Sequence, residues 1–282
     1  MSYITLPERS SVSSSTRKLF AGMPPTVFLA FLIIVIVALW AIVPSLFTSH
    51  SPVTAVPLDR FESPSAAHWF GTDYLGRDEF TRVVYGTRSS VLNAFVAVGI
   101  GLAVGGALGL IAGFFGGLTD SVIGRGVDTM LAIPAFLLAV TIVVALGFHT
   151  VNAAIATGIT SIAIFARIMR AETLRVRQSV FVESSYLQGG SRLFVLFRHV
   201  LPNAYRSVLA LSVLQLGYAI IVIAALAFLG YGSPPPAADW GLLISDGQNY
   251  QFAPWLVYCP AAVVVITVLS INRISRWLRN TN

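Results

Sequence analysis

Few side chains in this 282-residue chain are of the kinds that carry out metal or nucleophilic chemistry. The four histidines lie far apart, and no HExxH segment occurs, so the sequence offers no metal-ligand spacing at His50, His68, His149 and His199. Cys259 is the only cysteine and permits no intrachain disulfide. Lys18 is the only lysine and stands outside any glycine-rich loop, so no P-loop for ATP is present. We expect no catalytic residue, cofactor or metal in this chain.

Two nearby carboxylates, Asp73 and Asp78, could in principle form a general acid/base pair. They end the tripeptides Gly-Thr-Asp and Gly-Arg-Asp, which are typical of turns and helix caps. We therefore interpret them as structural residues that hold a short helix over residues 79–85 in an external loop. A catalytic role for the pair is the alternative.

The segment 182–203 combines charge, glycine and proline in a pattern typical of a docking surface. Helical character precedes Gly189, and the Gly189-Gly190 pair ends it. A second short helix is expected over 192–199, and Pro202 is expected to end or kink it. Glu183 is expected to bind a partner, the alternative being a local pair with Arg177.

The elements that must position these residues are transmembrane helices. Hydrophobic residues make up 56% of the chain and charged residues only 11%, whereas soluble domains have about a quarter charged. Apolar cores suited to spanning lie at 27–47, 91–115, 130–147, 151–165, 208–229 and 256–271. The net charge of +6 could suggest nucleic acid, but loops that face anionic lipid explain it better. The sequence predicts an all-α polytopic membrane protein with no nucleic-acid partner.

One charge-free stretch, 129–166, is too long for a single span. As one helix it would reach about 57 Å, nearly twice the hydrocarbon thickness of a bilayer. The residues 147–152 provide a break in its middle. We therefore predict two spans joined by a tight hairpin, and six spans in all.

Lysine and arginine placement predicts the orientation. With an internal N-terminus, fourteen of the 18 Lys and Arg residues fall on the cytoplasmic side and four outside. Both termini are therefore expected in the cytoplasm, in a multi-pass protein of the bacterial plasma (inner) membrane. The first span is interpreted as an uncleaved anchor, because its apolar region is too long for a signal peptide.

Glycines recur every fourth residue along the second span, at Gly101, Gly105, Gly109, Gly113 and Gly117. This spacing puts them on one helix face, where another helix can approach closely. Two interpretations stay open: tight packing inside this chain, or a surface that contacts another subunit during a change of shape.

Polar residues within the fourth and fifth spans are candidates for lining a pathway: Thr157, Thr160, Ser161, Ser212, Gln215 and Tyr218. Interhelical hydrogen bonding is the alternative. The span cores contain no Asp, Glu or His, which argues against an intramembrane enzyme and a proton-coupled transporter.

Five segments, in order, resemble the permeases of the dipeptide/oligopeptide/nickel branch of binding-protein-dependent ABC importers. The docking segment is similar to that family's "EAA" loop through Glu183, Ser184, Ser185, Gly189, Arg192, His199, Leu201, Pro202 and Asn203, with Ser for both alanines and His for a hydrophobic residue. The other four resembling segments are 68–78, 112–120, 128–134 and 227–241. The likeness covers roughly residues 27–279.

The resemblance implies the architecture of a type I importer permease and a non-enzymatic role in peptide transport, or in nickel or metallophore transport as the alternative. It implies a second homologous permease, two ABC ATPase subunits or one two-domain ATPase, and an extracytoplasmic binding protein. ATP and Mg would be bound by the ATPase subunits. The alternative is a stand-alone channel or secondary transporter, and the presence of the docking segment argues against it.

The expected organisation has five parts. A cytoplasmic segment (1–26) precedes the first span (27–47) and an external loop with a short helix (48–90). A core of five helices follows (91–273), including a cytoplasmic coupling loop (171–206), and a cytoplasmic tail (274–282) ends the chain.

Overall fold

The computed structural model describes residues 24–281, and every named element within that range is helical. The expectations for residues 1–23, including the cytoplasmic position of Lys18, lie outside the described residues. The α-helices are α2 (Pro25–Ile42), α3 (Glu79–Ile100), α4 (Gly106–Phe115), α5 (Gly117–Ala132), α6 (Ala135–Leu146), α7 (Thr150–Arg177), α8 (Val180–Leu187), α9 (Arg192–Val195), α10 (Leu201–Leu226), α11 (Trp240–Gly247) and α12 (Trp255–Thr281).

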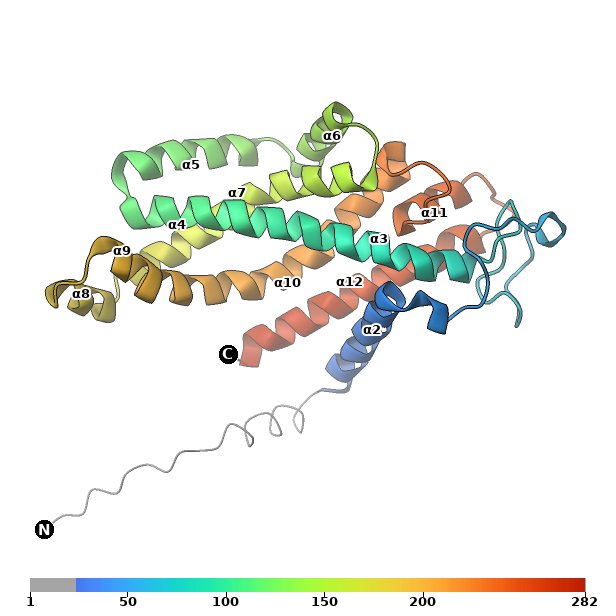
Figure 1. Ribbon diagram of the computed structural model, residues 1–282, viewed down its shortest axis with the longest axis horizontal. Coiled ribbons are helices and arrows are strands. Elements are labelled where there is room, and N and C mark those ends of the chain that lie inside the picture. The colour runs from blue at the N-terminus through green and yellow to red at the C-terminus, as the bar shows by residue number, and fades with distance from the viewer. Residues whose placement is uncertain (1–23, 282) are drawn as a thin grey trace, which may run out of the picture.

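Short helical turns join or continue these helices. They are η1 (Pro44–Leu46), η2 (Pro57–Asp59), η3 (Gly101–Gly105), η4 (Leu196–Val200) and η5 (Ala227–Tyr231). The all-α expectation is confirmed. The long helices lie roughly along one direction, with α8 and α9 at one end of the molecule and the residue 48–78 loop at the other (Figure 1).

Five helices in residues 24–281 are long and apolar enough to cross a membrane, and a bent helix pair makes six if it counts as one span. The five are Pro25–Ile42, Glu79–Phe115, Thr150–Arg177, Arg192–Tyr231 and Trp255–Arg279. The pair α5 and α6 bends by 92°. The expected six crossings require that this pair crosses as one broken span, and the straight span expected over 130–147 is not observed.

Pro134 explains the bend between α5 and α6. Proline has no N–H for the helix ladder and pushes the preceding residue out of the helical region. Ile133 accordingly adopts an extended backbone (φ −89°, ψ 131°), and α6 begins only at Ala135. The 12-residue α6 reaches about 18 Å, so it cannot cross the hydrocarbon alone.

The tight hairpin between the third and fourth crossings is confirmed. Gly147, with φ of 97°, ends α6, and α7 begins at Thr150. The Asn152 side chain donates hydrogen bonds to the carbonyl oxygens of Leu146 and Gly147, at 3.0 and 2.9 Å. These bonds satisfy carbonyls that the helix end leaves without an intrahelical partner.

The separate short helix over 79–85 is not observed, because these residues form the first turns of α3. Together with η3 and α4 they make a continuous 37-residue helix, about 55 Å long. That length exceeds the hydrocarbon thickness of about 30 Å, so one end must project beyond it. The charged first turns, with Glu79 and Arg82, form the projecting end.

Asp73 and Asp78 have structural partners, as the turn-and-cap interpretation predicts. Asp78 caps α3 by accepting a hydrogen bond from the backbone N–H of Thr81 at 2.7 Å. Asp73 accepts from Arg77 at 2.7 Å and from Arg82 at 2.8 Å. Arg82 also lies 3.7 Å from Asp246 of α11. The network therefore ties the outer loop to α3 and α11. Burial raises the pKa of Asp246, whereas the positive charge of Arg82 lowers it.

Pro202 does not end a helix, contrary to expectation. It occupies the first turn of α10, where a missing N–H costs little, and η4 runs directly into it as one π-helical turn. The Asn203 side chain donates a hydrogen bond to the carbonyl oxygen of His199 at 2.6 Å. The expected loop 171–206 therefore consists largely of the ends of two long helices, with α8 between them. The expected tail 274–282 likewise continues α12 as far as Thr281.

Candidate functional site: the coupling segment and its supporting helices

Residues 180–203, which comprise α8, α9, η4 and the start of α10, are called the coupling segment. Its break at Gly189 has the geometry of a Schellman motif. The N–H of Gly189 bonds to the Tyr186 carbonyl oxygen at 3.0 Å, and that of Gly190 bonds to the Ser185 carbonyl oxygen at 2.9 Å. Gly189 has a φ of +85°, a region that side chains with a Cβ rarely adopt. The expected conformational role of this glycine is therefore seen in the structure.

Ser191 starts the second helix of the segment. Its hydroxyl accepts a hydrogen bond from the Phe194 N–H at 3.3 Å, as an N-cap residue does. Arg192 follows as the first residue of α9 and is exposed. Gly190 packs against α8, since a Cβ added there would lie 2.7 Å from the Ser185 carbonyl oxygen. These contacts fix the turn between α8 and α9.

Buried apolar residues anchor this segment to the body of the protein. Val182 of α8 and Val195 of α9 are fully buried and belong to the main hydrophobic core. The His199 ring lies against Phe181 and Phe194, with centroids 6.2 and 5.7 Å apart, and so links the two helices. These contacts fix α8 and α9 to the body of the protein.

Large apolar side chains are exposed along the segment that contains Glu183. Its exposed large side chains are Val180, Phe181, Leu187, Leu193, Phe194 and Phe197. Leu187 is 83% exposed, and such clustered apolar exposure marks an interaction surface. Glu183 is exposed and forms no ion pair with any described residue. The alternative partner Arg177 instead donates to the Gly113 carbonyl oxygen, at 3.5 Å.

The glycine ridge packs inside the chain, against α7. A Cβ at Gly105 would lie 2.4 Å from the Ile162 carbonyl oxygen, and one at Gly109 would lie 2.3 Å from that of Ala166. Gly101 and Gly113 are similarly close to α7, with first contacts at 2.8 and 2.9 Å. Of the two interpretations left open, the structure favours tight internal packing for these four.

Gly117 is not part of the ridge. The helix α4 ends at Phe115, and both Gly116 and Gly117 have positive φ, which turns the chain into α5. Nothing lies within 4 Å of a Cβ built on Gly117. The four-residue spacing continues to Gly117 in the sequence, but the helix ends before it. Gly117 therefore does not share a helix face with the other four glycines.

The polar residues proposed as pathway lining share no hydrogen bond between α7 and α10 in the described part of the chain. Thr157, Thr160 and Ser161 are buried within the chain, and their hydroxyls donate to carbonyl oxygens of α7 itself. Ser212 donates to the Val208 carbonyl oxygen one turn back. Tyr218 is exposed, whereas the Nε2 of Gln215 is buried without a hydrogen-bond partner in the described residues. Only the fifth-span members lie partly at the surface of this chain.

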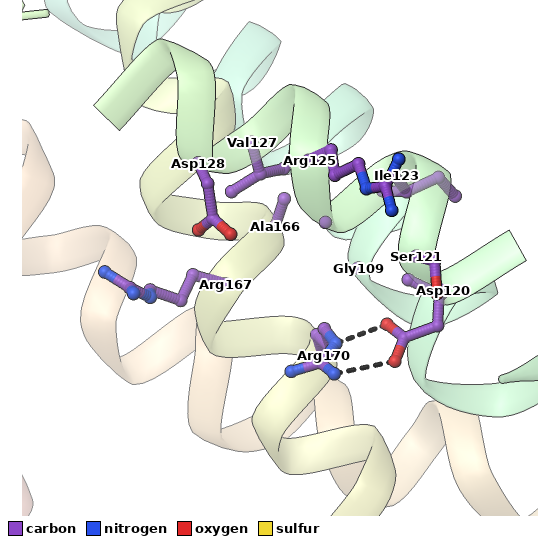
Figure 2. A pocket seen from close by; sticks show the side chains of 12 residues that line it. Gly109, Asp120, Ser121, Ile123, Arg125, Val127, Asp128, Ala166, Arg167 and Arg170 are labelled. Carbon is purple, nitrogen blue, oxygen red and sulfur yellow. Dashed lines mark hydrogen bonds and ion pairs between the residues drawn. The ribbon is translucent and has the colours of Figure 1, made fainter. Parts of the chain in front are cut away.

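A charged cleft of about 400 Å³ lies between α4, α5 and α7 (Figure 2). Asp120 of α5 receives two hydrogen bonds from Arg170 of α7, one of them at 2.7 Å from Nη2. Asp128 and Arg167 lie farther along the same cleft. The helix α5 contacts α7 through this bidentate ion pair and through an apolar cluster in which Val127 packs with Ala163 and Ala166.

Sequence reasoning used Asp120 and Asp128 only as parts of resembling segments and did not predict this cleft. The pairing joins residues 50 positions apart on different helices. A lone carboxylate between two apolar stretches was the available signal, but its partner becomes evident only from the packing of α5 on α7.

Comparison with known proteins identifies the family. Residues 105–281 match the family described as "Binding-protein-dependent transport system inner membrane component". The chain belongs to this permease family. The match includes the glycine ridge from Gly105 onward, the cleft and the whole coupling segment. The permease is therefore a multi-pass component of the inner membrane.

Curated relatives cover most of the permease. It is 42% identical over 85% of its length to the dipeptide transport system permease protein DppC of Alkalihalophilus pseudofirmus, covering 79% of that protein. It is 35% identical to the glutathione transport system permease protein GsiD of Pectobacterium atrosepticum, over 88% of this chain and 82% of the relative. It is 36% identical to the probable D,D-dipeptide permease DdpC of Escherichia coli, over 92% and 87%. These relatives are transport subunits, so the permease is not an enzyme.

A solved structure shares the fold. The permease aligns with a chain of an amino acid ABC transporter crystallised with histidines, with a TM-score of 0.58 and 16% identity. The alignment covers 72% of this chain and 95% of the other. The expected importer-permease architecture is thereby confirmed.

Proposed function

We propose that this permease forms, together with a second homologous permease, the translocation path of an ATP-driven importer for di- or oligopeptides. The observation that carries the proposal is the set of relatives above, which are named for dipeptide, D,D-dipeptide and glutathione transport. All three names denote peptides or a peptide derivative. They favour peptide cargo over the nickel or metallophore alternative.

The coupling segment is proposed to seat on an ABC ATPase subunit. Its apolar side chains around an unpaired Glu183 suit a groove that buries hydrophobic surface and supplies a cation or N–H donor. Closure of the ATPase pair on ATP and Mg would then move α8, whose buried Val182 is part of the main core. The permease needs no cofactor of its own for this role.

The opposite end of the molecule is proposed to receive the solute-binding protein. Leu58, Trp69 and Phe252 are exposed there, on loops held by the Asp73–Arg82 network. An exposed aromatic surface suits a protein partner. Because these loops are tied to α3 and α11, docking at this end can act on the membrane helices.

Cargo is tested by uptake into proteoliposomes that contain the complete importer. We expect ATP-dependent uptake of a labelled dipeptide, stimulated by the loaded binding protein and absent when this permease is omitted. Labelled glutathione and ⁶³Ni²⁺ are measured in parallel. Uptake of nickel without any peptide uptake would refute the peptide assignment.

The orientation, with both termini in the cytoplasm, is tested by cysteine labelling. Cys259 is first replaced by Ser, and single cysteines are then placed at Leu58 and Leu187, both highly exposed. A membrane-impermeant maleimide should label Leu58→Cys in intact spheroplasts and Leu187→Cys only after lysis. Labelling of Leu187→Cys before lysis would reverse the proposed topology.

A further inference from the structure

A groove of about 230 Å³ lies along the line where α2 packs against α12. Leu29, Ala30 and Ile33 of α2 form one wall, and Ile266 and Leu269 of α12 form the other. Leu29, Ile266 and Leu269 are 56%, 47% and 58% exposed, so described residues leave this apolar surface largely uncovered. In a membrane, the surface of such a groove is filled by lipid chains or by another helix.

One end of the groove is closed by the guanidinium of Arg273, which has no anionic partner among residues 24–281. The Nε and Nη2 atoms of Arg273 donate to the Thr26 hydroxyl oxygen, at 3.0 and 2.8 Å. A guanidinium has five N–H donors, so these bonds leave three unused. Neither α2 nor α12 contains an Asp or Glu, and Arg273 makes no ion pair with any described residue.

Further positive charge continues along the same helix. Arg276 and Arg279 follow Arg273 at intervals of three residues and are exposed. Residues three apart are neighbours on a helix surface, so the three arginines form a short basic stripe beyond the apolar walls. The groove thus passes from hydrocarbon-like walls directly to a cluster of cations.

The dimensions fit one leaflet of a bilayer. Ile33 lies seven residues from Thr26, which corresponds to about 10 Å along α2. Half of the hydrocarbon core is about 15 Å thick. Acyl chains that enter the groove would therefore extend along its walls while their glycerophosphate group reaches the level of Arg273.

We propose that this groove binds an anionic phospholipid, such as phosphatidylglycerol or cardiolipin, with its phosphate on Arg273. Guanidinium groups bind phosphate oxygens through paired N–H donors, and basic pockets between membrane helices attract anionic headgroups. A zwitterionic lipid would bring an ammonium group close to the basic stripe and is disfavoured. The site is separate from the peptide path, so the inference does not depend on the identity of the cargo.

The test measures lipid retention by the purified importer. The complex in neutral detergent is titrated with phosphatidylglycerol or with phosphatidylcholine, and bound lipid is counted by native mass spectrometry. We expect at least about five-fold weaker phosphatidylglycerol binding in Arg273→Gln, and no change in Arg206→Gln, an exposed arginine on α10. Phosphatidylcholine binding should be weak in both.

A second variant tests the contribution of the groove to lipid binding separately from that of the Arg273 charge. Leu269→Trp keeps Arg273 but narrows the groove, and it should also reduce phosphatidylglycerol retention. Equal retention of phosphatidylglycerol by the parent, Arg273→Gln and Leu269→Trp complexes would overturn the proposal. So would efficient crosslinking of Leu269→Cys to the second permease, since the groove would then be covered by protein.

Discussion

Gly109→Ala should lower the melting temperature of the purified permease complex and reduce its yield, although alanine is the better helix former. The added Cβ would stand 2.3 Å from the Ala166 carbonyl oxygen and 2.9 Å from both the Arg170 nitrogen and the Met169 Cβ. Two of these atoms belong to the α7 backbone and cannot rotate away. Overpacking of this kind costs about 1–3 kcal/mol, which exceeds the roughly 1 kcal/mol that alanine gains over glycine in a helix.

Two other glycines on the same continuous helix provide matched controls. A Cβ at Gly99 meets nothing within 4 Å, and one at Gly106 meets only the Met169 Cε at 3.6 Å. Gly99→Ala and Gly106→Ala should therefore melt at the parent temperature or slightly above it. The measurement is thermal unfolding in detergent together with copurification of the second permease. If Gly109→Ala melts with the controls, α4 and α7 are not in the close contact described above.

The larger Gly109→Leu variant extends the series. It places about four heavy atoms at the same contact, and separation of α4 from α7 is the only way to accommodate them. Assembly should then fail rather than weaken. A normally assembled and active Gly109→Leu permease would show that α4 faces a loose surface.

The sequence showed the four-residue spacing of the glycines, but it did not show where the helix that carries them ends. A residue every fourth position gives one helix face only as long as the helix continues. Gly116 and Gly117 end it, and their positive φ values leave no trace in a four-residue repeat. The sequence also could not say what packs on the ridge, because α7 lies about 60 residues farther along the chain.

Hydropathy predicted where the long apolar helices lie better than how far they extend. The first turns of α3 contain Glu79 and Arg82, which read as a polar loop. The charge of Arg82 is compensated by three carboxylates: Asp73 of the preceding loop, Glu79 of α3 itself and Asp246 of α11. Only tertiary structure brings those partners together, and with them the helix extends well beyond the apolar core.

One proline was overlooked in the sequence and another was misinterpreted. Pro134 breaks the third crossing within a stretch that hydropathy alone presented as continuous. Pro202 was expected to end a helix, but it lies in the first turn of α10, where a helix tolerates proline. The difference depends on position within the helix, which the composition of a short segment does not reveal.

The coupling segment was the part of the site that local sequence predicted best. The glycine pair, the N-capping Ser191 and the helical stretch before them are local signals. The anchoring role of Val182 and Val195 was missed, since a single buried valine in a short helix has no distinguishing pattern.

Gly189→Val should abolish peptide transport while leaving the membrane helices assembled. Gly189 has a φ of +85°, and nothing lies within 4 Å of the Cβ position, so the effect is conformational and not a clash with a neighbour. A left-handed backbone costs a residue with a Cβ roughly 1–2 kcal/mol, and more for a β-branched side chain. The two bonds of the Schellman motif would be lost as the backbone relaxes, and α8 would turn away from α9.

The matched control is Gly189→Asn, because asparagine tolerates the left-handed region and is the usual substitute for glycine at a helix C-terminus. It should retain most transport. In Gly189→Val, the second permease should still copurify, whereas ATP hydrolysis stimulated by the loaded binding protein should fall to near its basal rate. A cysteine at Ser184, in a Cys259→Ser background, should crosslink to the ATPase in the parent and much less in Gly189→Val. A chain without a P-loop must receive the energy of ATP hydrolysis through contact with an ATPase subunit. If that cysteine crosslinks to no ATPase and Gly189→Val transports normally, this contact does not depend on the shape of the coupling segment. The segment would then not couple ATP hydrolysis to transport.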